Sequence, residues 1–196
     1  MGPRAFLDAS VLFSVALTDL LLRLATESLF EPLWSPEVEA EWIRRLLEKR
    51  PDLSEERIRR RAVRMREHFS RSVVPQRQYL PYLSTIDLPD PDDRHVVAAA
   101  FAGGAEVLVT YNLKHFPQEA LVHFELEPLH PDAFLTDLLE AEIRTNGQPH
   151  RVLAAIRALR SALSHPPSPE EWIRFLEKKH GLHAFARALQ SFVGQI

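Results

Sequence analysis

The sequence predicts an α/β fold with a central parallel sheet flanked by helices, followed by a C-terminal helical extension. Short apolar runs typical of buried strands alternate along the chain with longer stretches of helical periodicity. The clearest run is residues 107–110, which is apolar and β-branched and lies between a Gly-Gly helix stop and a polar turn. Ligands of such sheets bind outside the carboxyl ends of the strands, so polar residues at those ends are the first candidates for a site.

The elements follow in order along the chain. Residues 5–7 predict a buried strand that ends at Asp8, with a helix from about Val11. Ser35 has the character of an N-cap with proline in the first helical position, and a basic helix begins at Ser54. The remaining elements are expected as strands at 33–34, 85–88, 107–110 and 124–128, and as helices at 96–102 and 131–143.

A composition break near residues 145–149 divides the chain into two predicted domains. We expect the α/β domain to comprise residues 1–146 and the helical extension residues 147–196. Within the extension, Ser168 and Glu171 have the spacing of a capping box, and Gly181 separates two helices.

Composition excludes several classes of protein. The chain has 196 residues, of which 45% are hydrophobic and 26% charged, as in ordinary globular domains. It contains no cysteine, which excludes disulfides and thiolate metal sites and fits a cytoplasmic protein. The most apolar stretch, residues 11–30, carries Asp19, Arg23 and Glu27, so no membrane span is expected.

The net charge of −3 argues against a general polyanion binder, but positive charge is concentrated locally. Residues 57–71 are rich in arginine, and a helix there would present one apolar stripe and an opposite basic face. That face would suit RNA phosphates or an acidic protein partner, although such faces are commonly just solvated. The arginines are Arg57, Arg59, Arg60, Arg61, Arg64, Arg66 and Arg71.

Acidic and amide side chains recur at predicted strand ends or on a nearby helix. Carboxylates gathered in one cleft repel one another, and a hard divalent cation such as Mg²⁺ or Mn²⁺ removes that cost. The same cation activates water and stabilises phosphodiester cleavage without a nucleophilic side chain. Singly, each residue has a plainer interpretation as a helix cap, a turn residue or a solvated side chain. The set comprises Asp8, Glu41, the cluster Asp90, Asp92 and Asp93, and Asn112.

Three stretches resemble one family in its own order. Residues 6–12 (FLDASVL) resemble the opening of PIN-domain ribonucleases, which include the toxins of VapBC toxin–antitoxin pairs. Residues 88–100 and 107–117 are similar to the next blocks of one PIN subfamily whose longer members carry a C-terminal helical extension. The resemblance covers roughly residues 5–140 and implies a PIN-like three-layer sandwich with four or five parallel strands.

The resemblance also implies a Mg²⁺- or Mn²⁺-dependent endoribonuclease. Its acidic positions fall on Asp8, Glu41 and Asp93, with Glu37 and Glu39 as alternative registers and Asp92 as the fallback. Its fourth position falls on Asn112, and its supporting polar positions fall on Ser10 and Thr110. RNA, a cognate antitoxin and a second copy of the chain are the implied partners, and Arg94 and Lys114 are candidates for the RNA backbone.

Two departures from the family leave a second function open. Asn112 replaces a carboxylate found in many relatives, and His115 stands where many relatives have another aspartate. A catalytically weak PIN-fold module that binds RNA or protein is therefore the alternative. A phosphatase with an aspartyl nucleophile fits less well, because Ser10 occupies the place of its second aspartate.

Overall fold

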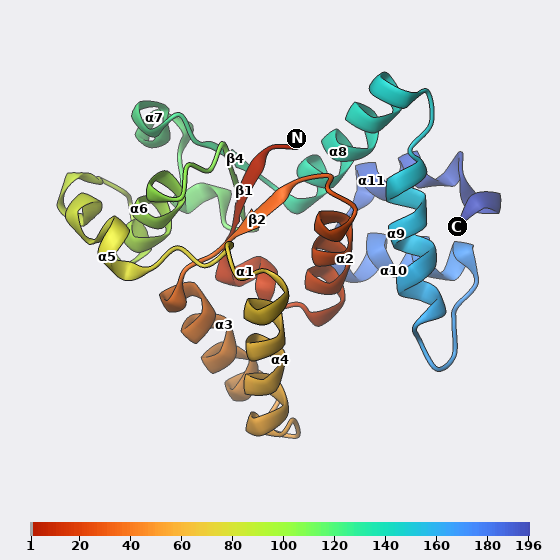
Figure 1. Cartoon of the computed structure of the whole chain (residues 1–196), viewed down its shortest axis with the longest axis horizontal. Helices are drawn as coiled ribbons and strands as arrows, with labels where there is room; N and C mark the ends of the chain where they lie inside the picture. The colour runs from red at the N-terminus through yellow and green to blue at the C-terminus, as the bar shows by residue number, and fades with distance from the viewer. Residues whose placement is uncertain (1) are drawn as a thin grey trace. The chain divides into compact units, whose positions relative to one another are not determined.

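The computed structural model describes residues 2–196 and contains one four-stranded sheet (Figure 1). All of its pairings are parallel, in the order β2-β1-β3-β4. The predicted central parallel sheet with flanking helices is thus confirmed. The strands are β1 (Arg4–Leu7), β2 (Glu31–Leu33), β3 (Val107–Val109) and β4 (Glu127–Leu129).

Strand β1 occupies an inner position, and three of its four residues are apolar and buried. Ala5, Phe6 and Leu7 have no exposed surface. The chain passes from β1 to β2 on one side and then crosses to β3 on the other, so the strand order reverses between β1 and β3. The carboxyl ends of these two strands are neighbours, since the register pairs Leu7 with Val109. A crevice outside such a reversal is where α/β sheets bind ligands.

Two sequence expectations differ from the structure in detail. The helix expected from Val11 is two helices, α1 (Ala9–Leu12) and α2 (Val15–Thr26). The strand expected at residues 85–88 is wrong, because the segment after the 3₁₀ turn η1 (Leu80–Thr85) has no strand partner. Ile86 and Leu88 are buried while Asp87 is exposed, so the alternation that suggested a strand anchors an irregular segment on the core.

Contact clustering divides the described chain into two compact units, and the sheet lies in the unit formed by residues 2–15 and 30–129. In this unit α3 and α4 lie side by side (Figure 1). Ser35 caps α3 as predicted, because its Oγ accepts the Val38 N–H at 3.2 Å. Trp34 and Trp42 are fully buried core residues. The unit's helices are α1, α3 (Pro36–Lys49), α4 (Glu55–His68), α5 (Gln76–Tyr79), α6 (Arg94–Ala102) and α7 (Gln118–Leu121), with 3₁₀ turns η1, η2 (Pro91–Asp93), η3 (Leu113–His115) and η4 (Val122–Phe124).

The second unit comprises residues 16–29 and 130–196 and is helical. The predicted capping box is present, since Ser168 and Glu171 each accept a backbone N–H of the other. Gly181 ends its helix at a φ of 64°, a conformation that favours glycine. The predicted boundary between residues 146 and 147 stays a prediction. The unit contains α2, α8 (Pro131–Asn146), α9 (His150–Ser161), α10 (Pro169–His180), α11 (His183–Gln190) and the 3₁₀ turn η5 (Val193–Gln195).

Within residues 2–196, none of the helices combines the length and the apolar character needed to cross a bilayer.

Candidate active site

Asp8 lies directly after β1 and is almost fully buried, with 5% of its surface exposed. It caps α1, because its carboxylate accepts the backbone N–H of Ala9 at 2.7 Å and that of Ser10 at 3.4 Å. The capping interpretation of this residue is therefore correct, but it does not account for the whole environment. Two hydroxyl groups also donate to the same carboxylate oxygen.

Those hydroxyls belong to Ser10 and Thr110. Ser10 Oγ lies 2.5 Å and Thr110 Oγ1 2.8 Å from Asp8 Oδ2. Ser10 Oγ in turn accepts the Tyr111 N–H at 3.2 Å, and Thr110 Oγ1 accepts the Asn112 N–H at 3.0 Å. The hydroxyls thus fix the carboxylate against the chain that leaves β3. The position of the carboxylate is therefore set by four donors, two backbone N–H groups and two hydroxyls.

Glu41 lies on α3, which packs against α1, the helix that follows Asp8. Its nearest basic group is Arg45, one helical turn later, at 2.7 Å. Burial nevertheless raises the pKa of Glu41 above its usual range; Arg45 opposes this rise, while the nearby charges of Asp8 and Asp93 add to it. Glu41 is therefore paired with an arginine, and its pKa is still raised by the charges of the other two carboxylates.

The alternative registers on α3 have other partners. Glu37 accepts a hydrogen bond from the hydroxyl of Tyr79. Glu39 is buried and pairs with Arg66 of α4. Burial and the charges of Asp8 and Asp93 raise the pKa of Glu41, so Glu41 remains the candidate acidic residue of this helix.

Asp93 precedes α6, but it does not act as a cap there. Its side chain makes no capping hydrogen bond; instead Oδ2 lies 2.8 Å from Nδ1 of His115. Burial raises the pKa of Asp93, the contact with His115 opposes the rise, and the charges of Asp8 and Asp90 add to it. Sequence reasoning missed this pairing, because nothing in the spacing places residue 115 against residue 93.

The other residues of the acidic turn have local roles. Asp90 Oδ1 accepts the Asp92 N–H at 3.0 Å, which holds the turn, while Asp90 Oδ2 lies 4.0 Å from Nδ1 of His115. Asp92 is exposed. Among residues 2–196, Asp90, Asp93 and His115 form a group of ligand atoms close enough to share one cation.

Three further predicted residues lie on the same segments. Asn112 is joined to the site through its backbone N–H on Thr110, and no contact of its side chain with the three carboxylates is found within the described residues. Lys114 is exposed on η3, and Arg94 is half-buried at the start of α6. Arg94 is thus next to Asp93 in the sequence, Asn112 is two residues after Thr110, and Lys114 is next to His115.

Asp8, Glu41 and Asp93 therefore form an electrostatically coupled set. Ionising all three at once places negative charges in a partly buried region with one arginine on its flank. A small divalent cation relieves that repulsion and takes oxygen ligands. Carboxylate oxygens of this kind suit Mg²⁺ or Mn²⁺. Among residues 2–196, however, the ligand atoms of Asp90, Asp93 and His115, and not those of Asp8, Glu41 and Asp93, all lie within 4.8 Å of one another.

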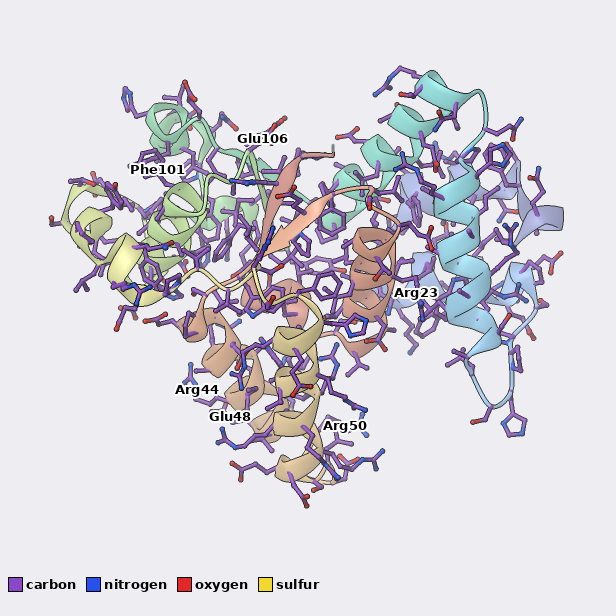
Figure 2. All side chains as sticks on the ribbon, in the orientation of Figure 1. Arg23, Arg44, Glu48, Arg50, Phe101 and Glu106 are labelled. Atoms are coloured by element: carbon purple, nitrogen blue, oxygen red, sulfur yellow. The ribbon has the colours of Figure 1, made fainter. Side chains whose placement is uncertain are left out.

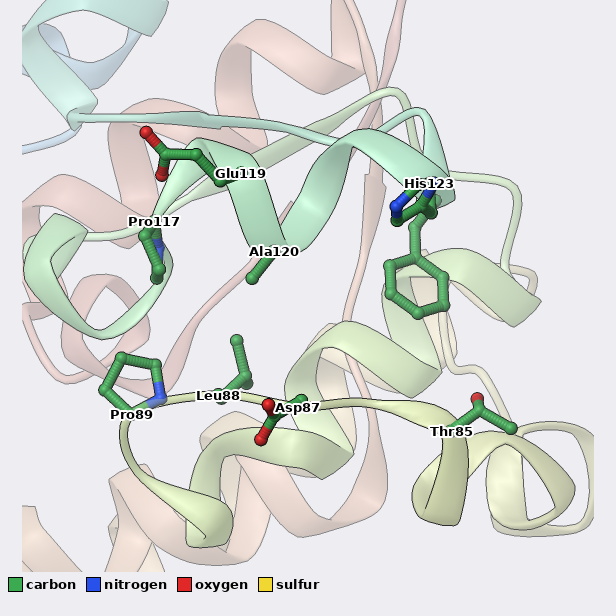
Figure 3. Close-up of a pocket in the computed structure, with 9 residues that line it drawn as sticks. Thr85, Asp87, Leu88, Pro89, Pro117, Glu119, Ala120 and His123 are labelled. Carbon is green, nitrogen blue, oxygen red and sulfur yellow. The ribbon is translucent and has the colours of Figure 1, made fainter.

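A hollow of about 670 Å³ lies beside the acidic turn (Figure 3). One wall is residues 85–89, which run directly into Asp90, and the other is formed by residues 117–124 after His115. Leu88 and Ala120 face its interior in Figure 3, whereas the Glu119 carboxylate points away from it. The hollow does not include Asp8, Glu41 or Asp93 in its lining.

Comparison with known proteins gives the family of the chain. The model of the PIN domain matches residues 4–114, more than half of the chain. The chain belongs to the PIN-domain family. A second model, the VapC50 C-terminal domain, matches residues 131–191 and so lies within the helical C-terminal part. The resemblance to a longer VapC-like subfamily is confirmed by this pair of matches.

One curated relative is a protein of Mycobacterium tuberculosis (strain ATCC 25618 / H37Rv) named "Putative ribonuclease VapC50". This PIN-domain chain is 58% identical to it over 48 residues, 24% of this chain and 28% of the relative. The match thus spans little more than a quarter of the relative's length. No solved structure matches the chain.

Proposed function

We propose that this chain is a divalent-metal-dependent endoribonuclease that hydrolyses RNA phosphodiester bonds. The proposal rests on three carboxylates from separate parts of the sequence, because burial and the charge of Asp8 raise the pKa of both Glu41 and Asp93. Each of the three has a partner of its own, in the hydroxyls on Asp8, Arg45 on Glu41 and His115 on Asp93. Acidic groups that are perturbed by burial and by like charges nevertheless concentrate at functional sites.

Each carboxylate has a role suited to its surroundings. Asp8, fixed by two hydroxyls, and Asp93, at the start of α6, would hold Mg²⁺ or Mn²⁺. The bound cation would activate a water molecule and stabilise charge on the phosphate oxygens. Glu41 completes the set, and its raised pKa suits a side chain that orients the attacking water and accepts its proton.

Basic groups on three segments would bind the RNA backbone. Arg94 directly follows Asp93 in the sequence, and Lys114 directly precedes His115. On α4, Arg59 and Arg60 pair with acidic residues one turn earlier, and Arg66 pairs with Glu39. Arg57 and Arg64 are exposed, and within the described residues they form no ion pair, so they are the better candidates on this helix.

We further propose that the chain is the toxin of a toxin–antitoxin pair and acts as a homodimer. The support is its family and the name of its curated relative. The partner would be a cognate antitoxin protein that blocks access of RNA to the acidic set.

A catalytically weak PIN-fold module is the second candidate, and two observations favour it. Asn112 removes one negative charge from the family's pattern, and His115 occupies an oxygen of Asp93 that a cation would use. Metal affinity separates the two functions: a module that needs no cation would not bind Mn²⁺ at millimolar concentration.

The test is cleavage of a structured RNA with Mg²⁺, with Mn²⁺ and with chelator. We expect the unmodified chain to cleave only with metal, and Asp8→Asn and Asp93→Asn to lose at least about 100-fold in rate, the scale of loss when a group stabilising the transition state is removed. Asp137→Asn, in α8 of the helical unit, is the matched control and should cleave normally. Equal activity in all four proteins would reject the assignment.

A further inference from the structure

His115 is brought to the acidic turn by a short backbone path. It ends η3, where its N–H donates to the Asn112 carbonyl at 2.9 Å. The next residue, Phe116, is buried with 2% of its surface exposed and anchors the turn in the core. Position and direction of the imidazole are therefore set by the fold rather than by a flexible loop end.

The acidic side of this cluster is equally well fixed. Asp90 uses Oδ1 to hold its own turn, which leaves Oδ2 directed toward His115. Asp93 directs Oδ2 toward the same imidazole nitrogen. One nitrogen and two carboxylate oxygens, drawn from two short segments, thus converge on one point.

The spacing of these atoms suits a six-coordinate cation. Ligands bonded at about 2.1 Å lie about 3.0 Å apart on neighbouring corners of an octahedron and about 4.2 Å apart on opposite corners. Nδ1 of His115 lies 2.8 Å from Asp93 Oδ2 and 4.0 Å from Asp90 Oδ2. A cation bound to Nδ1 and Oδ2 would displace the proton that these two atoms share.

We propose that Asp90, Asp93 and His115 form a cation position of their own, which shares Asp93 with Asp8 and Glu41, and that the His115 nitrogen makes this position select Mn²⁺ over Mg²⁺. Mg²⁺ is a hard ion that takes oxygen ligands and keeps its waters, while imidazole is a ligand of transition metals. This inference rests on the proposed metal-dependent function for its role in catalysis, but it concerns a binding event that is measurable without RNA.

The position is distinct from the Asp8 side in its ligand chemistry. Asp8 is surrounded by hydroxyl and backbone donors, and Glu41 pairs with Arg45, so that side offers carboxylate oxygens. The imidazole of His95 also acts on the charge of Glu41, and a His95→Ala variant, which should keep the nitrogen coupling, separates it from His115. The sharing of Asp93 means that both positions lose a ligand when that residue changes. Substitutions of His115 should remove the nitrogen ligand of the second position, and they also release the Asp93 oxygen that both positions share.

The direct test is pulsed electron paramagnetic resonance of Mn²⁺ bound to the full chain without RNA. We expect coupling of the bound Mn²⁺ to a nitrogen nucleus, and its replacement by the ¹⁵N pattern when histidine is labelled. In His115→Ala and His115→Asp the coupling should vanish, while His68→Ala, at the exposed end of α4, should keep it. A Mn²⁺ spectrum of the unmodified chain without nitrogen coupling would overturn the proposal, whatever the variants do.

Calorimetric titration with Mn²⁺ and with Mg²⁺ measures the selectivity. His115→Asp should lower the ratio of Mn²⁺ to Mg²⁺ affinity by at least about tenfold, the smaller loss typical of altered metal surroundings. Circular dichroism shows whether each variant is folded. An unchanged ratio in folded His115→Asp contradicts the proposal and leaves the nuclease function standing. Nitrogen-coupled Mn²⁺ in a chain that cleaves no RNA would contradict the nuclease function and leave this proposal standing.

Discussion

The carboxylates of Glu41 and Asp93 are more easily protonated than ordinary acidic side chains, because they are partly buried and close to Asp8. At neutral pH without metal, their ionisation works against the folded state. Such a cost is a common property of sites shaped for a ligand rather than for stability.

The free-energy cost of ionising Glu41 makes the stability of the metal-free protein depend on pH. The pKa of Glu41 is raised from a starting value of 4.5, so the folded chain holds that proton to higher pH than the unfolded chain does. The contribution of the neutral carboxyl to stability is complete below the unfolded pKa and is lost as pH rises through the folded pKa.

Glu41→Gln should therefore raise the thermal unfolding temperature of the metal-free protein at pH 7, because glutamine keeps the neutral form. A gain of about 1 kcal/mol corresponds to roughly 2–4 °C in a chain of this length. Differential scanning calorimetry in chelator measures it. Glu55→Gln, whose exposed carboxylate pairs with Arg59, should change stability by less than about 0.5 kcal/mol. A destabilised Glu41→Gln protein would contradict the account of this residue.

The sequence predicted the positions of some site residues relative to one another and not of others. Asp8, Ser10 and Thr110 follow neighbouring parallel strands, so the rule for strand ends brings them together. The register on α3 stayed open among three glutamates, since the partners of Glu37 and Glu39 come from distant segments. The contact between Asp93 and His115 depends on the path of an irregular turn, which periodicity does not describe.

Among the elements, α4 was predicted with an apolar stripe and a basic face. The structure shows which arginines of that face have acidic partners. Ile58, Ala62 and Met65 are buried as the periodicity requires. The neighbouring arginines are not equivalent, because some have acidic partners on their own helix. The hairpin of α3 and α4 is also charged on its other side, where Arg44 and Glu48 point outward (Figure 2).

RNA binding should distinguish these arginines. Arg64→Gln should weaken binding of single-stranded RNA and reduce the slope of log affinity against log salt by about 0.7, the value for one lost phosphate contact. Arg59→Gln should do so less, because Glu55 already compensates its charge at 2.7 Å. Filter binding with the Asp8→Asn protein, over a range of salt, avoids cleavage. Equal slopes in both variants and the parent would remove α4 from the RNA surface.

The segment before the acidic turn shows why one element was mistaken. Alternating Ile86 and Leu88 match a strand pattern, and both side chains are buried. Alternation of apolar and polar residues indicates that alternate side chains are buried, but it does not indicate that a neighbouring strand is present. The sheet already has β3 beside β1, and residues 85–88 pack without entering it.

At the scale of the whole molecule, the compact units do not follow the chain linearly. Residues 16–29, which contain α2, cluster with residues 130–196. Leu17, Leu20 and Leu24 of α2 are fully buried, so removal of residues 130–196 would strip α2 of the helices of its own unit. A boundary placed by composition could not show this, because composition carries no information on long-range packing.

A chain that ends at Leu129 should therefore expose the apolar face of α2. We expect stronger binding of an environment-sensitive hydrophobic dye and a lower unfolding temperature than for the full chain. Adding a separately produced segment of residues 130–196 should reduce dye binding. If the shortened chain unfolded cooperatively at the same temperature without binding dye, residues 16–29 would not need the C-terminal helices.

The most direct measurement for the whole account is anomalous X-ray scattering from crystals of the protein grown with Mn²⁺. We predict a Mn²⁺ peak within about 2.3 Å of carboxylate oxygens of Asp8 and Asp93, with Glu41 close by, since protein oxygens bind such ions at about that distance. A map with no peak between these side chains at saturating Mn²⁺, or with manganese only elsewhere on the molecule, would contradict it.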